Sequence, residues 1–425
     1  MVRDTNKNYK FDWITIILFF LLVGFGWLNI LSASYTSGEI DYFTFSQPYG
    51  KQSVFILLTF FIIIVILGIE AKFYERFSSI IYIFSMLSLI GLFIFGKNVN
   101  GATSWYAIGS MTLQPSEFAK AATALAVAKQ LSDLNMNINS IKDQIQTLII
   151  IIIPALLVIL QNDTGSTIVY GAFFFVLYRE GLPKYYLSIG LSVIVLSVLA
   201  LKFGPLITSL IAVVSLSGFY YFNRKKFKFF QLLFVLLLSI GLSYAVKASY
   251  DHILKPHHQD RISLWLRLEK DPVKLEAMKK TFAYNLNESE KAIREGRFNG
   301  KGFMEGTRTT GKFVPEQHTD YIFSTVGEEW GFLGSSLVVI LFVLLLLRIL
   351  HLAELQKSQF SRAYGYGVAS IIFIHFLINI GMVMGLIPTI GIPLPLFSYG
   401  GSGLWAFTIL IFIFIKLDSN RINEW

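Results

Sequence analysis

The sequence contains no cysteine among its 425 residues. Disulfide frameworks, thiol catalysis and cysteine-ligated metal sites are therefore excluded. Charged residues are also scarce: they form 15% of the chain, against about 25% of a typical soluble domain. The sequence has no HExxH pattern, and its Gly-rich segment 300–306 lacks the Lys-Ser/Thr ending of a P-loop. This composition excludes a single soluble core.

Long apolar runs are abundant instead, and hydrophobic residues make up 54% of the chain. Each run is long enough to approach the roughly 30 Å needed to cross a bilayer, where a single segment must be helical to satisfy its backbone. The runs cover residues 13–34, 53–69, 78–96, 113–128, 146–160, 166–178, 185–201, 205–222, 229–246, 330–347, 364–386 and 402–415. We predict an all-α, polytopic transmembrane bundle of 10–12 helices, with 12 favoured, forming one membrane domain over residues 1–425.

Lys and Arg residues gather in alternate connections between these runs. The basic connections hold Arg3, Lys7, Lys10, Lys72, Arg76, Lys129, Lys142, Arg179, Lys184, Arg224, Lys225, Lys226, Lys228, Arg348, Lys357, Arg362, Lys416 and Arg421. The short loops on the other side hold only Lys51, Lys97 and Lys202. By the positive-inside rule, both termini are cytoplasmic and residues 247–329 form one large extracytoplasmic loop.

One segment of this loop, residues 269–297, is charged and favours a helix. Its apolar residues Leu275, Met278, Phe282 and Leu286 recur at helical spacing. An amphipathic helix on the outer leaflet would have this pattern, and so would a helix packed on the protein's own outer surface.

Two ionisable residues lie within the apolar run 113–128. Glu117 and Lys120 are three positions apart and therefore share one face of a helix. Ionisable groups at membrane depth are costly and are functional or paired. The pair either lines a polar cavity that faces substrate or is a structural ion pair that fixes helix packing.

Several acids lie near the ends of the apolar runs. Asp163 is either a helix N-cap or a carboxylate at the outer mouth of a cavity. Asp320 is either a cap, a solvated acid, or a general base for a hydroxyl held at the membrane surface. His318 could do the same or act as a hydrogen-bonding partner. Glu328 and Glu329 are interpreted as structural acids near the start of the next helix.

The Gly-punctuated segment 300–312 carries Lys301, Arg308 and Lys312. Such a loop could hold a phosphate or pyrophosphate, although exposed basic side chains are common on any surface. A divalent cation would bridge a carboxylate and substrate phosphate oxygens, because the sequence has no dense cluster of metal ligands.

The last outer connection, residues 385–403, is apolar but contains three prolines and repeated glycines. These residues stop helix formation. Non-helical backbone at membrane depth is tolerated where protein or a cavity shields it. We therefore predict a re-entrant loop that lines a cavity.

Four motifs now occur in order along the chain. They are Trp105 with 114–120, then 161–166, then 300–334, and finally 379–403 with Pro-Leu-Pro-Leu-Phe-Ser-Tyr-Gly-Gly-Ser at 393–402. Together they closely resemble the RodA/FtsW family of membrane-embedded peptidoglycan glycosyltransferases. The Gly-Ile-Pro-Leu-Pro-Leu motif is more similar to that of the elongation members, RodA, than to that of the division members, FtsW.

The resemblance implies polymerisation of lipid II on the outer face of the bacterial cytoplasmic (inner) membrane, with inversion at the anomeric centre. It implies that Asp320 is the general base or a cation ligand, and that a class B penicillin-binding protein is the partner. A divalent cation, Mg or Mn, is the expected cofactor, and neither an organic cofactor nor nucleic acid is expected. The predicted substrate-binding residues are Glu117, Lys120, Asp163, Arg261, Lys301, Arg308, His318 and Ser398.

One departure from the family stands out. Residues 185–246 are expected to include two more helices than the ten-helix members possess.

Two other functions are compatible with many helices: a lipid II flippase, which needs polar groups through the full membrane depth, and a non-catalytic scaffold for a transpeptidase. The position of the key acid at the outer interface favours the enzyme.

Overall fold

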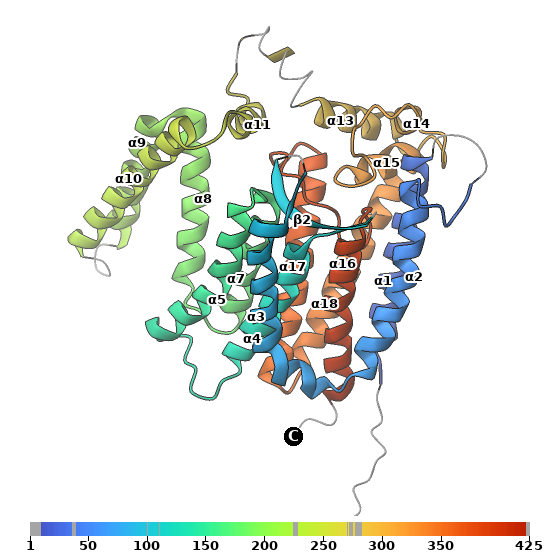
Figure 1. Ribbon diagram of the computed structural model, residues 1–425. Coiled ribbons are helices and arrows are strands. Elements are labelled where there is room, and N and C mark those ends of the chain that lie inside the picture. The colour runs from blue at the N-terminus through green and yellow to red at the C-terminus, as the bar shows by residue number, and fades with distance from the viewer. Residues whose placement is uncertain are drawn as a thin grey trace, which may run out of the picture. The chain divides into compact units, whose positions relative to one another are not determined.

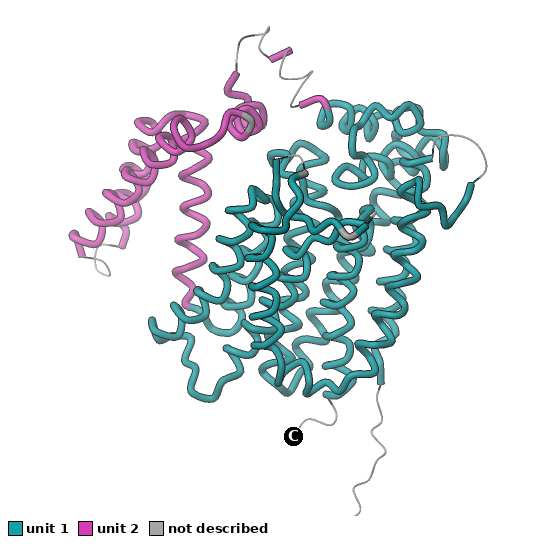
Figure 2. The backbone as a smooth tube through the Cα atoms, in the orientation of Figure 1, with its two compact units in different colours: residues 1–182, 285–425 teal, residues 183–284 magenta. Residues whose placement is uncertain are grey.

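The computed structural model describes residues 10–35, 40–99, 101–109, 111–223, 228–269, 271, 275–276 and 283–421. The chain divides into two compact units, one of residues 1–182 with 285–425 and the other of residues 183–284 (Figure 2). The predicted basic residues Arg3, Lys7 and Arg224–Lys226 lie outside the described ranges, as do Met278 and Phe282.

The first unit is a helical bundle capped at one end by short helices (Figure 1). Its long helices are α1 (Trp13–Ser34), α2 (Pro48–Gly68), α3 (Ala71–Phe95), α4 (Pro115–Leu131), α5 (Ile141–Leu160), α16 (Gly331–Glu354), α17 (Gln359–Val383) and α18 (Gly401–Asn420). Its shorter elements are α6 (Thr164–Val169), the 3-10 turn η1 (Tyr170–Ala172), α7 (Phe173–Arg179), α13 (Tyr284–Gly296), α14 (Thr307–Thr310) and α15 (Ile322–Glu329).

All twelve predicted runs are helical in the described part of the chain. Ten of the helices there are long and apolar enough to cross a membrane. The other two runs are α4, which is 17 residues long, and the broken segment α6–η1–α7. The prediction of a multi-pass, all-α bundle is confirmed.

Helices α17 and α18 form the centre of the first unit. Of their most apolar stretches, 67% and 83% of residues are buried, against 22% for α3. Many large apolar side chains of the outer helices point outward instead, including Phe61, Ile64 and Phe84. Outward apolar faces around a buried centre are the arrangement that lipid requires.

A small three-stranded antiparallel sheet was not predicted. Strands β1 (Lys97–Val99), β2 (Ala102–Ile108) and β3 (Met111–Leu113) pair in chain order between α3 and α4. The backbone N–H of Thr103 donates to Gln161 O at 3.0 Å, and the Tyr106 hydroxyl donates to Ser88 O at 2.8 Å. The sheet therefore lies over the ends of α3 and α5.

Helix α13 decides between the two interpretations of segment 269–297. Ser289 donates a hydrogen bond to Val383 O at the end of α17 (3.2 Å). Gly296 packs so closely on α15 that a Cβ there would overlap the carbonyl of Gly327. This half of the segment is therefore packed on the protein's own outer surface. Leu275 lies beyond α13, whereas Leu286 is part of it.

The second unit holds α8 (Tyr185–Phe203), α9 (Pro205–Asn223), α10 (Phe229–His252) and α11 (Pro256–Leu266). Its long helices pack through small side chains. The buried ones are Ala200 in α8, Thr208 and Ala212 in α9, and Ser239 and Ser243 in α10. Small residues at helix contacts are typical of membrane-embedded helices.

Ion pairs join remote segments at one end of the first unit. Asp12, before α1, pairs with Arg348 near the end of α16, and Arg179, at the end of α7, pairs with Glu354. This end, the lower one in Figure 1, also carries the ends of α2 and α18. Helices α13 to α15 and the 384–400 segment lie at the opposite end.

Candidate active site

Glu117 and Lys120 meet within the bundle. Their side chains are 4% and 2% exposed, and Lys120 Nζ lies 2.7 Å from Glu117 Oε1. Lys120 Nζ also lies 2.8 Å from Nε2 of His375 in α17. An ammonium group can only donate, so this nitrogen accepts and the ring proton resides on Nδ1. Nδ1 lies 3.3 Å from Pro393 O.

This chain of contacts joins α4, α17 and the loop after α17. Glu117 and Lys120 are therefore an ion pair, as one of the two interpretations predicts. His375 was not predicted. The available signal was a His in an apolar run, one helical turn before Asn379.

Asp163 is the N-cap of α6. Its Oδ1 accepts the backbone N–H of Ser166 at 2.9 Å. Its Oδ2 accepts from the side chain of Gln114, just before α4, at 3.0 Å. The capping interpretation is thus confirmed, and the same carboxylate also ties the start of α6 to the start of α4.

Asp320 lies just before α15, whose N-cap is Tyr321. The carboxylate lies against the 384–400 loop: a Cβ on Gly391 would be 3.2 Å from Asp320 Oδ2. Gly391 has φ +81°, a conformation that favours glycine. A Cβ on Gly165, in α6, would in turn lie 2.9 Å from the Gly391 carbonyl oxygen. Three segments that are remote in sequence therefore converge beside Asp320.

The backbone around Asp320 is tied to the same loop. Asn379 Nδ2 donates to Asp320 O at 2.8 Å and to Ile392 O at 2.7 Å. Ser398 Oγ donates to Thr319 O at 2.6 Å. The predicted re-entrant segment is non-helical from 384 to 400, and it contributes the carbonyl of Ile392 and the hydroxyl of Ser398 to these contacts.

His318 lies beside this site. Its ring centroid is 5.2 Å from that of Tyr399, and its carbonyl accepts the backbone N–H of Tyr399 at 2.9 Å. Burial lowers the pKa of His318 below its usual value, although Glu316 opposes the change. A neutral ring at pH 7 follows, which suits a hydrogen-bonding role.

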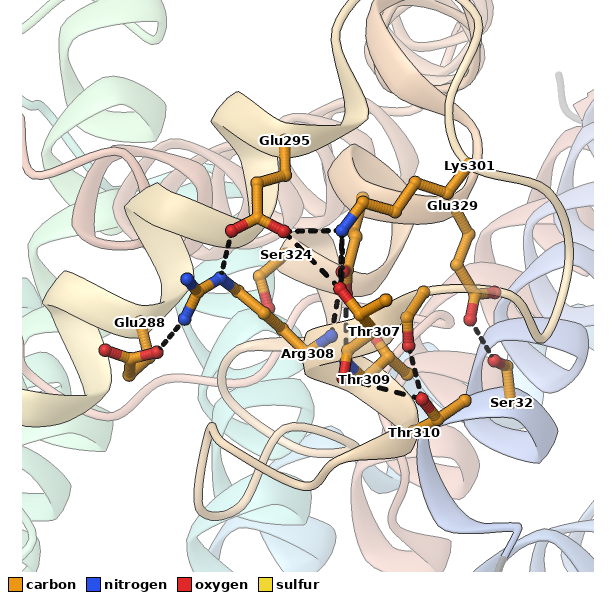
Figure 3. A network of polar contacts seen from close by, with 12 residues as sticks. Ser32, Glu288, Glu295, Lys301, Thr307, Arg308, Thr309, Thr310, Ser324 and Glu329 are labelled. Atoms are coloured by element: carbon orange, nitrogen blue, oxygen red, sulfur yellow. Dashed lines mark hydrogen bonds and ion pairs between the residues drawn. The ribbon is translucent and has the colours of Figure 1, made fainter.

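Lys301 and Arg308 lie in a network of acids above α15 (Figure 3). Lys301 Nζ contacts Glu295 at 2.5 Å and Glu328 at 3.0 Å. Arg308 Nε donates to Glu295 at 2.6 Å, and Arg308 Nη1 pairs with Glu288. The hydrogen bonds from Lys301 and then Arg308 lower the pKa of Glu295 to about 2.

Glu328 and Glu329 are both fully buried at the end of α15. The interpretation as structural acids is confirmed, but its reason was wrong. Glu328 accepts the backbone N–H groups of Arg308 and Thr309, each at 2.9 Å, so it holds the preceding loop and not the start of α16. Glu329 accepts a hydrogen bond from Ser32 in α1 (Figure 3).

Two further basic residues singled out in the sequence belong to other elements. Arg261 is in α11 of the second unit, and Lys312 is an exposed residue of the 311–316 turn. The structure thus brings together Asp163, Asp320 and Ser398 through the 384–400 loop. The predicted roles of all these residues in substrate binding stay predictions.

Comparison with known proteins decides the family. The model of the FtsW/RodA/SpoVE family, described as "Cell cycle protein", matches residues 12–204 and 184–423. The chain belongs to this family. The resemblance inferred from the four motifs is therefore confirmed.

Relatives in the FtsW/RodA/SpoVE family are similar along most of this chain. The peptidoglycan glycosyltransferase RodA of Treponema pallidum (strain Nichols) is 28% identical over 440 residues, covering 97% of this chain and 98% of its own. The peptidoglycan glycosyltransferase MrdB of Escherichia coli K12 is 30% identical over 344 residues, covering 81% and 78%.

Solved structures share the fold. The rod shape determining protein RodA of Thermus thermophilus has a TM-score of 0.61 and 22% identity, with 97% of this chain and 98% of that chain covered. A chain in the structure described as "Structural coordination of polymerization and crosslinking by a peptidoglycan synthase complex" has a TM-score of 0.72 and 23% identity, covering 97% and 99%.

Proposed function

We propose that this protein is a peptidoglycan glycosyltransferase that polymerises lipid II for cell elongation and shape. Relatives named peptidoglycan glycosyltransferase match it over nearly its whole length. One structural observation carries the proposal. The carboxylate of Asp320 lies where the start of α15, the 384–400 loop and the start of α6 converge.

Asp320 acts as the general base in this proposal. The 4-hydroxyl of one sugar attacks the anomeric carbon of the other chain's reducing-end sugar. The new C–O bond forms as the bond to undecaprenyl pyrophosphate breaks, and the pyrophosphate leaves with that electron pair. The hydroxyl proton passes to the Asp320 carboxylate. A base on the face opposite the leaving group gives inversion.

The leaving pyrophosphate needs positive charge nearby. Lys301 and Arg308 are candidates, but they already pair with Glu288, Glu295 and Glu328. Lys291 also pairs with Glu288 at 2.7 Å, so the three basic and three acidic side chains of this network sum to a net charge of zero and leave no surplus positive charge. Binding a pyrophosphate would therefore require an additional cation, or Lys301 and Arg308 would have to leave their acidic partners and pair with the pyrophosphate.

Mg or Mn is proposed as that cation. The described residues contain no group of three or more His, Cys, Asp or Glu that could hold a metal. A resident metal site therefore does not fit them. In the alternative to the general-base role, Asp320 would be the single protein ligand of a divalent cation that is bound mainly by the pyrophosphate oxygens, and this cation would neutralise the leaving group.

The protein spans the membrane several times, and we propose the bacterial cytoplasmic (inner) membrane with both termini inside. This orientation is supported by the basic residues at the end of the first unit that carries the ends of α2 and α18, including Lys72, Arg76 and Lys416. It puts Asp320 at the outer face, where lipid II is polymerised.

A class B penicillin-binding protein is the proposed partner, supplying transpeptidation. A chain of similar fold occurs in a peptidoglycan synthase complex that coordinates polymerization and crosslinking. No nucleic acid is expected to bind.

The decisive experiment is polymerisation of labelled lipid II by the purified protein with its penicillin-binding partner. Wild type is compared with Asp320→Asn and with Glu316→Gln, each with and without Mg or Mn. Glu316 is an exposed acid four residues before Asp320, so its variant controls for loss of charge on the same segment. We expect long glycan from wild type and Glu316→Gln and none from Asp320→Asn.

Equal glycan from all three proteins would refute the role of Asp320. An absence of glycan from a folded wild type would refute the enzyme. Translocation of fluorescent lipid II by the protein in vesicles would then identify a flippase, and its absence would favour a scaffold.

A further inference from the structure

Three successive carbonyl groups before α15 are each bonded by the C-terminal part of the chain. His318 O accepts the backbone N–H of Tyr399 at 2.9 Å. Thr319 O accepts from Ser398 Oγ at 2.6 Å, and Asp320 O accepts from Asn379 Nδ2 at 2.8 Å. The segment that carries the candidate base is therefore held along its backbone by remote residues, which lie 59 and 79 positions away for the two side-chain contacts.

Asn379 is fully buried in α17. Both protons of its amide are used, one on Asp320 O and one on Ile392 O at 2.7 Å. An amide oxygen could not face two carbonyl oxygens, so the orientation of this side chain is set by its partners. Asn379 thus joins the backbone of Asp320 to the 384–400 loop.

Ser398 has a similar double use. Its Oγ donates to Thr319 O and accepts the backbone N–H of Leu394 at 2.9 Å. Ser398 was predicted to bind substrate, yet both contacts of its hydroxyl are to the protein backbone. Neither Ser398 nor Asn379 needs to touch substrate in order to affect the reaction.

We propose that Asn379 and Ser398 are positioning residues that set the direction of the Asp320 carboxylate. The inference rests on the proposed function of Asp320 as the base. Fixing the carbonyls of Thr319 and Asp320, which lie on the two sides of the Asp320 Cα, fixes the direction of its Cα–Cβ bond. The carboxylate is then held beside Gly391, where a Cβ would be 3.2 Å from Oδ2.

The base must reach the hydroxyl proton over a hydrogen-bond distance, and a misplacement of about 1 Å costs about a hundredfold in rate. Losing one tether should therefore lower kcat by about tenfold to a hundredfold. The KM for lipid II should stay unchanged, because in this proposal the two residues act through the backbone of Asp320 and not by contact with the substrate.

The test is lipid II polymerisation kinetics of the purified full chain with its penicillin-binding partner. The variants are Ser398→Ala, Asn379→Leu, the conservative Ser398→Thr and the control Ser419→Ala. Ser419 is also a buried serine of the C-terminal region, but its hydroxyl bonds Lys416 O within α18 (2.8 Å). We expect Ser398→Ala and Asn379→Leu to lose kcat at constant KM, and Ser398→Thr to recover most of it. Ser419→Ala should match wild type.

Two results would overturn the inference while leaving the proposed function intact. One is wild-type kcat in folded Ser398→Ala when Asp320→Asn is inactive. The other is a loss of kcat in Ser398→Ala that equals the loss in Ser419→Ala. If Asn379→Leu does not fold, Ser398→Ala decides alone. Full activity of Asp320→Asn would instead refute the proposed function itself.

Discussion

Removing the acid of the buried Glu117–Lys120 pair should destabilise the protein strongly. In Glu117→Ala, the Lys120 ammonium would keep His375, 2.8 Å from Nζ, and the Phe407 ring, 5.8 Å from Nζ, but no counter-ion, in a position where its side chain is 2% exposed. Leaving a buried charge without its counter-ion costs about 3–5 kcal/mol of the free energy of unfolding.

A surface pair that joins the same helix, α4, to α3 provides the comparison. Lys129 contacts Glu75 at 3.4 Å, and the two side chains are 44% and 42% exposed. Exposed pairs of this kind contribute about 0–1 kcal/mol. Glu75→Ala should therefore leave the melting temperature nearly unchanged, whereas Glu117→Ala should lower it by several degrees.

Thermal unfolding of the purified protein in one detergent measures both effects. The double variant Glu117→Ala/Lys120→Met supplies the strictest check, because it removes both charges. It should be more stable than Glu117→Ala, since no unpaired ion remains. A double variant no more stable than the single one, or equal melting of Glu117→Ala and Glu75→Ala, would refute the desolvation argument.

Three further outcomes follow from the end of the first unit that carries α13 to α15 and the 384–400 loop. Burial raises the pKa of Glu329 from 4.5 to about 7. The folded state therefore binds the proton more tightly than the unfolded state, and the free energy of unfolding should fall as pH rises across that interval. Melting curves of Glu329→Gln should lack this loss of stability. The ion pairs lower the pKa of Glu295 from 4.5 to about 2, so the stability that Glu295 contributes is present above pH 4.5 and lost as pH falls toward 2. Glu295→Gln should reduce this fall of the melting temperature at acid pH, and an unchanged fall would contradict the reasoning. Gly391→Ala should reduce kcat for lipid II by at least about tenfold, because φ +81° and the nearby Asp320 carboxylate both disfavour a Cβ; wild-type kinetics would contradict the close approach.

The membrane architecture could be predicted from sequence because lipid imposes local rules. An apolar run in a bilayer must be helical, and basic residues mark the cytoplasmic side. Even the N-cap role of Asp163 is local, since its Oδ1 bonds a backbone group three residues away. The re-entrant loop was also a local inference, from prolines and glycines in an apolar stretch.

The small sheet was missed because its strands are three to seven residues long and lack a long alternating pattern. For Lys301 and Arg308, which were predicted to bind phosphate, the sequence did not show the acidic partners. Positive charge is visible in sequence, but the acids that pair with it are not: Glu288 and Glu295 are in α13, and Glu328 ends α15.

The sequence by itself determined the helices, their alternation across the membrane and the family, since each depends on neighbouring residues or motifs. Only the tertiary structure decided what surrounds the candidate base. Lys120 meets His375 across 255 residues, and Asn379 reaches the carbonyl of Asp320 across 59. Such contacts arise when remote helices pack together, and no local pattern in the chain encodes which polar groups then meet.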